Sequence, residues 1–163
     1  MLSAGRTLAA AGEEKRARQL ATSLASQIEP EPRSFAKLVE GEMLLHRGDY
    51  REAAARFREA GEILDTCLGR YLLSRACLEA GAFAETHAKL EICLKRRGEG
   101  MVMFLDDVPS YHVLPPVYYY LGRAQEGLGS AAAAESYRRF VELRPQADDD
   151  PLVLDARMRS GAN

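Results

Sequence analysis

The histidines, cysteines and carboxylates are the side chains of this sequence that could do chemistry, and their spacing predicts no reactive centre. The three histidines and three cysteines lie in different segments, and neither a Cys-x-x-Cys nor a His-Glu-x-x-His motif occurs. The serines lie in no Gly-x-Ser-x-Gly motif, and Gly98-Glu99-Gly100 is too short and too acidic for a phosphate loop. The adjacent acids Glu13-Glu14 and Asp106-Asp107 cannot face each other on a helix. We therefore predict a non-enzyme with no catalytic residues, cofactor or metal.

Composition narrows the class of protein further. The 163 residues suit one domain, and 22 Lys and Arg against 24 Asp and Glu argue against a general nucleic-acid-binding surface. The sequence has neither an apolar run of membrane-spanning length nor a signal-peptide pattern at residues 1–6. Cys67, Cys77 and Cys93 are odd in number and lie in helical patterns, which favours a reducing compartment. We expect a cytoplasmic protein that binds neither nucleic acid nor membrane.

A repeated helical pattern sets the expected elements. Four segments combine a small residue in a first helix, a glycine at a turn and a small residue in a second helix. The clearest copy spans residues 41–60, where Gly41 and Ala53 are small at a close helix crossing and Gly48 is predicted to adopt positive φ. Asp49 is expected to cap the second helix. The predicted turn glycines are Gly12, Gly48, Gly81 and Gly129.

This pattern resembles the tetratricopeptide repeat (TPR) family, whose unit is a helix–turn–helix of about 34 residues. The resemblance extends from Gly5 to Pro145 and is literal at Leu121-Gly122 and at Pro145, although the family's Trp is absent. It implies an all-α fold: a right-handed superhelical solenoid of helix–turn–helix repeats with a C-terminal capping helix. A related helical-hairpin repeat is the alternative. Either implies a scaffold that binds proteins.

The expected boundaries divide one domain, 1–163, into repeats, an insertion and a cap. The repeats are predicted at about 1–29, 34–66, 67–97 and 116–145, the insertion at 98–115 and the capping helix at 150–159. Residues 29–32, Glu-Pro-Glu-Pro, are expected to form a stiff linker.

The two ends of the chain are expected to differ. Asp150 and Pro151 are predicted to start the capping helix, with Leu152, Leu154 and Met158 covering the last hairpin. The sequence pattern starts within a first helix, at Leu2. The chain is therefore expected to be a fragment of a longer protein or to have a partner that covers its first helical face.

The resemblance also implies a concave groove lined by the first helices. Groove residues are expected directly after each small crossing residue and one turn to either side: Leu2, Arg6, Leu38, Glu42, His46, Tyr71, Arg75, Glu79, Tyr119 and Arg123. Arginines beside tyrosines suit an extended peptide or helix with acidic or phosphorylated side chains. In the alternative, the groove is solvated, with Arg75 paired to Glu79 and Glu42 to His46 or Arg47. The family's clamp of asparagines and lysines is not expected, since Asn163 is the sole asparagine.

The insertion is the most apolar stretch of the sequence. Residues 101–120 are expected to pack on the repeats or to form an adhesive interface. If the insertion covers the groove, Phe104 or Tyr111 would lie beside Arg123 and would regulate or complete the binding site.

Other functions remain open from the sequence. A structural module could form homo-oligomers through Leu2, Leu8 and residues 101–105. More faintly, residues 104–128, with Asp155-Ala156-Arg157, resemble the repeat-rich C-terminal regions of bacterial eukaryotic-type Ser/Thr kinases, which implies a docking or regulatory segment. The chain has no kinase motifs of its own. An enzyme with a pocket beneath the insertion is the third alternative.

Overall fold

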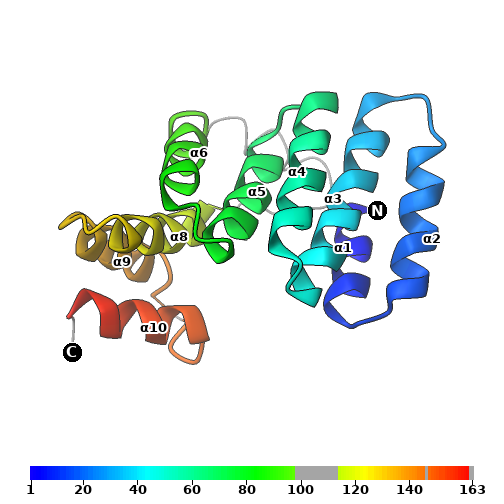
Figure 1. Cartoon of the computed structure of the whole chain (residues 1–163). Coiled ribbons are helices and arrows are strands. Elements are labelled where there is room, and N and C mark those ends of the chain that lie inside the picture. Colours follow the sequence, from blue (N-terminus) through cyan, green and yellow to red (C-terminus); the bar gives the residue numbers. More distant parts are fainter. Residues whose placement is uncertain (98–113, 146, 162–163) are drawn as a thin grey trace.

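The computed structural model describes residues 1–97, 114–145 and 147–161, and every regular element in these ranges is an α-helix (Figure 1). The all-α prediction is therefore confirmed. None of these helices is long and apolar enough to cross a lipid bilayer. The helices are α1 (Leu2–Ala10), α2 (Glu14–Ala25), α3 (Pro30–Arg47), α4 (Tyr50–Ile63), α5 (Cys67–Glu79), α6 (Phe83–Lys95), α8 (Leu114–Gly127), α9 (Ala133–Glu142) and α10 (Pro151–Ser160).

The helices pack largely in the order of the sequence. Along the described chain each helix contacts the next, and α1, α3, α5 and α8 also contact one another in succession. Figure 1 shows the resulting row, from α1 and α2 near the N-terminus to α10 at the C-terminus. We call α1, α3, α5 and α8 the first helices, and the surface they share the first-helix face.

The turn between α3 and α4 shows how the sequence ends one helix and starts the next. Gly48 has φ of 84°, which suits a residue without Cβ, and its N–H donates to the carbonyl of Leu45 at 3.1 Å. The predicted left-handed turn is confirmed here. Asp49 occupies the N-cap position of α4 as predicted, but its side chain makes no capping hydrogen bond and pairs with Arg47 at 2.8 Å instead.

Glycines also allow the helices to cross closely. A Cβ at Gly41 of α3 would lie 2.4 Å from the ring of Phe57 in α4, and one at Gly122 of α8 would lie 2.8 Å from Tyr137 in α9. Both rings are almost completely buried. The close crossing expected at Gly41 is thus confirmed, and the aromatic ring fills the space that the missing side chain leaves.

The apolar core has two parts. The larger extends from α1 to α8, and a smaller cluster joins α8, α9 and α10 around Tyr119, Tyr137, Phe140, Val153 and Ala156. All three cysteines are buried thiols.

Two expectations, one about residues 29–32 and one about Leu2 in α1, are wrong. Residues 29–32 do not form a linker, because α3 begins at Pro30; the first turn of a helix tolerates proline since its N–H groups lack helical acceptors. Leu2 does not lie on an open apolar face, because it is 3% exposed and packs into the core, with Leu8 partly buried beside it. The self-association alternative also involves residues 101–105, which lie outside the described ranges, and it stays a prediction.

The last helix, α10, has the predicted N-terminal cap, but it buries a different face from the one predicted. Asp150 accepts a hydrogen bond from the Leu152 N–H at 2.8 Å, and Pro151 occupies the first turn. The residues buried on α10 are Val153 and Ala156, whereas Leu154 and Met158 are 48% and 73% exposed. The expectation that Leu154 and Met158 cover the last hairpin is therefore wrong, since they lie on the opposite side of α10 from the buried pair.

Candidate functional site

A buried carboxylate joins three successive first helices on the first-helix face. The Nε of Arg6 in α1 donates to Oε1 of Glu42 in α3 at 2.7 Å, and Nη1 of Arg75 in α5 reaches the same oxygen at 3.4 Å. His46, one turn along α3, places Nε2 3.8 Å from the other carboxylate oxygen. The Glu42 side chain is 2% exposed, whereas those of Arg6 and Arg75 are 27% and 21% exposed. The site is therefore a carboxylate held beneath two partly accessible guanidinium groups.

The repeated spacing explains why these three side chains meet. Arg6, Glu42 and Arg75 each follow a small residue of a first helix, namely Gly5, Gly41 and Ser74. A Cβ at Gly5 would lie 2.4 Å from Val39 of α3, and the Ser74 carbonyl accepts from Thr86 of α6 at 3.4 Å. Gly5, Gly41 and Ser74 thus all lie at close helix contacts, and each is followed directly by a member of the cluster.

A hollow of about 200 Å³ lies beside this cluster. Its walls come from α3, α4, α5 and α8, through Leu45, His46, Tyr50, Arg75, Glu79 and Tyr120. The rings of Tyr71 and Tyr120 meet edge to face, with centroids 5.7 Å apart. Glu79 is exposed at the rim and makes no hydrogen bond or ion pair with another described residue.

The electrostatics keep Arg75 charged and Tyr71 neutral. Burial lowers the pKa of Arg75, but nearby Glu42, Tyr120 and Tyr71 outweigh burial and raise the pKa above its ordinary value. Burial raises the pKa of Tyr71, whose ring is only 6% exposed. Tyr71, predicted as a groove residue, is therefore buried in the core and does not line the hollow.

Arg123 and Tyr119 belong to a different contact. Tyr119 is 4% exposed and donates its hydroxyl proton to Asp155 of α10 at 2.8 Å, while Arg123 donates to the Tyr119 oxygen at 3.3 Å. Burial raises the pKa of Asp155, but the hydrogen bonds from Arg159 and Tyr119 lower it below its usual value. The structure uses this predicted groove pair to hold the last helix, and neither residue lines the hollow.

The remaining predicted residues separate into three groups. Leu2 and Leu38 are buried in the core, His46 and Glu79 line the hollow, and Phe104 and Tyr111 lie outside the described residues. The pairing of Glu42 with His46 is present, whereas Arg75 turns to Glu42 rather than to Glu79.

Sequence reasoning missed Leu45 and Tyr120 as wall residues. Each precedes or follows a predicted groove residue, at His46 and Tyr119, and one step along a helix turns the side chain by about 100°. Tyr50, at the start of α4, also lines the hollow.

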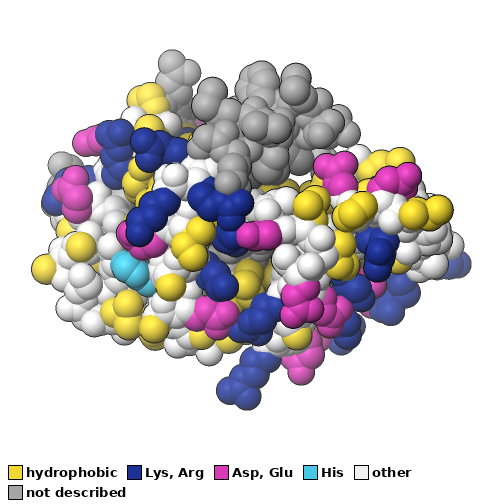
Figure 2. All heavy atoms as spheres, turned by 90° about the horizontal axis from the view of Figure 1, so that it is seen from above, with side chains coloured by type: hydrophobic (Ala, Val, Ile, Leu, Met, Phe, Trp, Pro, Cys, Tyr) yellow, Lys and Arg dark blue, Asp and Glu magenta, His cyan; other side chains and the backbone are white. Residues whose placement is uncertain are grey.

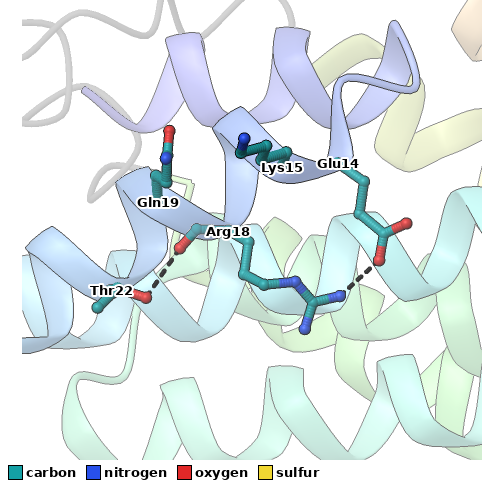
Figure 3. Close-up of a pocket in the computed structure, with 5 residues that line it drawn as sticks. All are labelled: Glu14, Lys15, Arg18, Gln19 and Thr22. Carbon is teal, nitrogen blue, oxygen red and sulfur yellow. Dashed lines mark hydrogen bonds and ion pairs between the residues drawn. The ribbon is translucent and has the colours of Figure 1, made fainter.

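Other hollows lie elsewhere on the described surface, including one of about 420 Å³ between α2, α3 and α4 and one of about 340 Å³ between α4, α5 and α6. A hollow of about 540 Å³ on α2 is lined by Glu14, Lys15, Arg18, Gln19 and Thr22, all from one helix (Figure 3). Arg18 pairs with Glu14, and Thr22 donates to the Arg18 carbonyl at 3.0 Å, so these polar groups are satisfied locally. Figure 2 shows basic and acidic side chains interspersed across the surface seen from above.

The side chains that line the hollow belong to several chemical types. Among the described ranges, no group of three or more His, Cys, Asp or Glu side chains could hold a metal ion. The hollow instead offers aromatic walls, one guanidinium, one imidazole and one carboxylate. In comparisons with known proteins, no family model, curated protein or solved structure matches this chain.

Proposed function

We propose that this chain is a non-catalytic protein–protein interaction module that binds an extended segment of a partner along its first-helix face. The observation that carries the proposal is the hollow between α3, α5 and α8, with the Arg6–Glu42–Arg75 cluster beside it. Side chains from successive hairpins thus converge on one surface. Such a surface suits a segment long enough to cross several helices.

The proposed architecture is a right-handed solenoid of TPR-like hairpins. Its support is the sequential packing of the helices, the contacts between successive first helices and the recurrence of glycine at turns and crossings. Stacked hairpins of this kind create extended binding surfaces. The three buried thiols support a reducing, cytoplasmic setting.

The size and lining of the hollow favour a peptide side chain over a small-molecule ligand. Pockets for small molecules usually enclose about 300–1,000 Å³, more than the volume of this hollow. Its walls include Tyr50, Tyr120 and Arg75, and tyrosine and arginine are residue types enriched at binding hot spots.

The test is selection from a phage-displayed random peptide library on the immobilised chain, followed by calorimetry with the enriched peptide. The double variant His46→Ala/Glu79→Ala should weaken binding about fivefold or more, because it removes two accessible walls of the hollow. The matched control is Lys15→Ala/Gln19→Ala on α2, which should bind like the wild type. A library without enrichment, or equal losses in both variants, would contradict the proposal.

A further inference from the structure

The Arg6–Glu42–Arg75 cluster holds more positive than negative charge. Two guanidinium groups share one carboxylate oxygen, so the trio carries a net charge of +1. Glu42 is shielded from water, while both arginines remain partly accessible. The excess positive charge is therefore presented outward from the centre of the first-helix face.

Arg6 also retains unused hydrogen-bond donors. A guanidinium has five N–H groups, and Arg6 uses Nε for Glu42. Within the described residues, its two terminal Nη groups make no hydrogen bond. These groups form the planar fork that binds a carboxylate through two parallel hydrogen bonds.

Glu42 acts as a positioning residue for the two arginines. It ties α1 and α5 to α3 through one oxygen atom, which limits the rotamers that Arg6 and Arg75 can adopt. Pre-ordered donors bind more tightly because less side-chain entropy is lost when the ligand arrives. The ordering comes from within the chain and needs no ligand.

We propose that Arg6 and Arg75 together receive one aspartate or glutamate side chain of the partner segment. This inference rests on the proposed function and names the partner's chemistry at one position. The rim carboxylate of Glu79 opposes an anion, but it is exposed, and water and salt screen its charge. Arg123 takes no part, since it donates to Tyr119 in the contact with α10.

The experiment uses the peptide enriched on the wild-type chain. Each Asp or Glu of that peptide is replaced by Asn or Gln, and affinities are measured by calorimetry for the wild type and for Arg6→Gln. One amide replacement should weaken binding to the wild type about tenfold, the effect of losing a charge-assisted hydrogen bond. The same replacement should have little effect on Arg6→Gln, because the interaction is already absent there.

The matched control is Arg18→Gln on α2, whose side chain is exposed and pairs with Glu14. This variant should still bind the acidic peptide about tenfold more tightly than the amide-replaced peptide. If Arg6→Gln fails to fold, the salt dependence of wild-type binding replaces it: affinity for the acidic peptide should fall with salt more steeply than affinity for the amide peptide.

The outcomes separate the two proposals. One outcome would overturn this inference and leave the proposed function standing: the peptide loses affinity for His46→Ala/Glu79→Ala, but no amide replacement in the peptide weakens its binding. Equal discrimination by the wild type and Arg6→Gln would overturn it as well. Failure to enrich any peptide would overturn the proposed function and this inference together.

Discussion

At the scale of single residues, Glu42 compensates the charges of two arginines on the first-helix face. A carboxylate with 2% exposure is costly to bury unless its charge is compensated, and here Arg6 and Arg75 compensate it from two different helices. Removing one member of such a group is more damaging than its net contribution suggests, because the remaining charges lose their partner.

Replacing Glu42 by Ala should lower the free energy of unfolding by about 2 kcal/mol, since two partly buried guanidinium groups would then face each other without a counter-charge. Chemical denaturation measures this change. Glu79→Ala is the control and should change stability by less than about 0.5 kcal/mol, because Glu79 is exposed and makes no ion pair with the described residues. Similar stabilities for the two variants would show that the cluster is not structural.

At the scale of helices, close packing depends on a glycine, which has no side chain, at the point where two helices cross. Gly41 brings α3 against the ring of Phe57, which is 1% exposed, so that a Cβ at this position would lie 2.4 Å from the ring. Gly61 is also helical, on α4, but no atom lies within 4 Å of a Cβ built there. The two glycines therefore have different physical roles in the same hairpin.

The variant Gly41→Ala should destabilise the chain by about 1–3 kcal/mol, because the new methyl group overpacks the helix crossing. Gly61→Ala should leave stability unchanged or raise it by up to about 1 kcal/mol, since alanine favours helix over glycine. Thermal or urea unfolding of both variants tests the contrast. If Gly41→Ala is as stable as the wild type, the crossing is looser than the structure indicates.

At the scale of the whole molecule, sequential packing predicts uneven stability. The central helices α3 and α5 contact helices on both sides, whereas α1 packs on α2 and α3, and α10 packs mainly on α9. Units that contact only their neighbours can open from the ends inward.

Hydrogen exchange followed by mass spectrometry should therefore find α3, α4 and α5 more protected than α1 and α10. The terminal helices lose fewer contacts when they open, so their amides should exchange faster. Equal protection along the described helices would instead indicate a single cooperative unit, and would argue against stacked, partly independent hairpins.

Local features were predictable from the sequence because they depend on residues close together in the chain. The helical class, the turn at Gly48, the close crossing at Gly41 and the cap at Asp150 were all read from such features. A glycine with positive φ or a capping aspartate acts within a few residues, so its effect needs no knowledge of distant segments.

Only the tertiary structure decided which partner each long side chain takes. Arg75 and Arg123 each follow a small residue of a first helix, yet Arg75 pairs with Glu42 of α3 and Arg123 with Tyr119, which itself binds Asp155 of α10. A flexible guanidinium binds the nearest acceptor in space, and that acceptor is set by how the hairpins stack. The burial of Val153 rather than Leu154 on α10 has the same origin, because α10's docking on α9 selects the face that is covered.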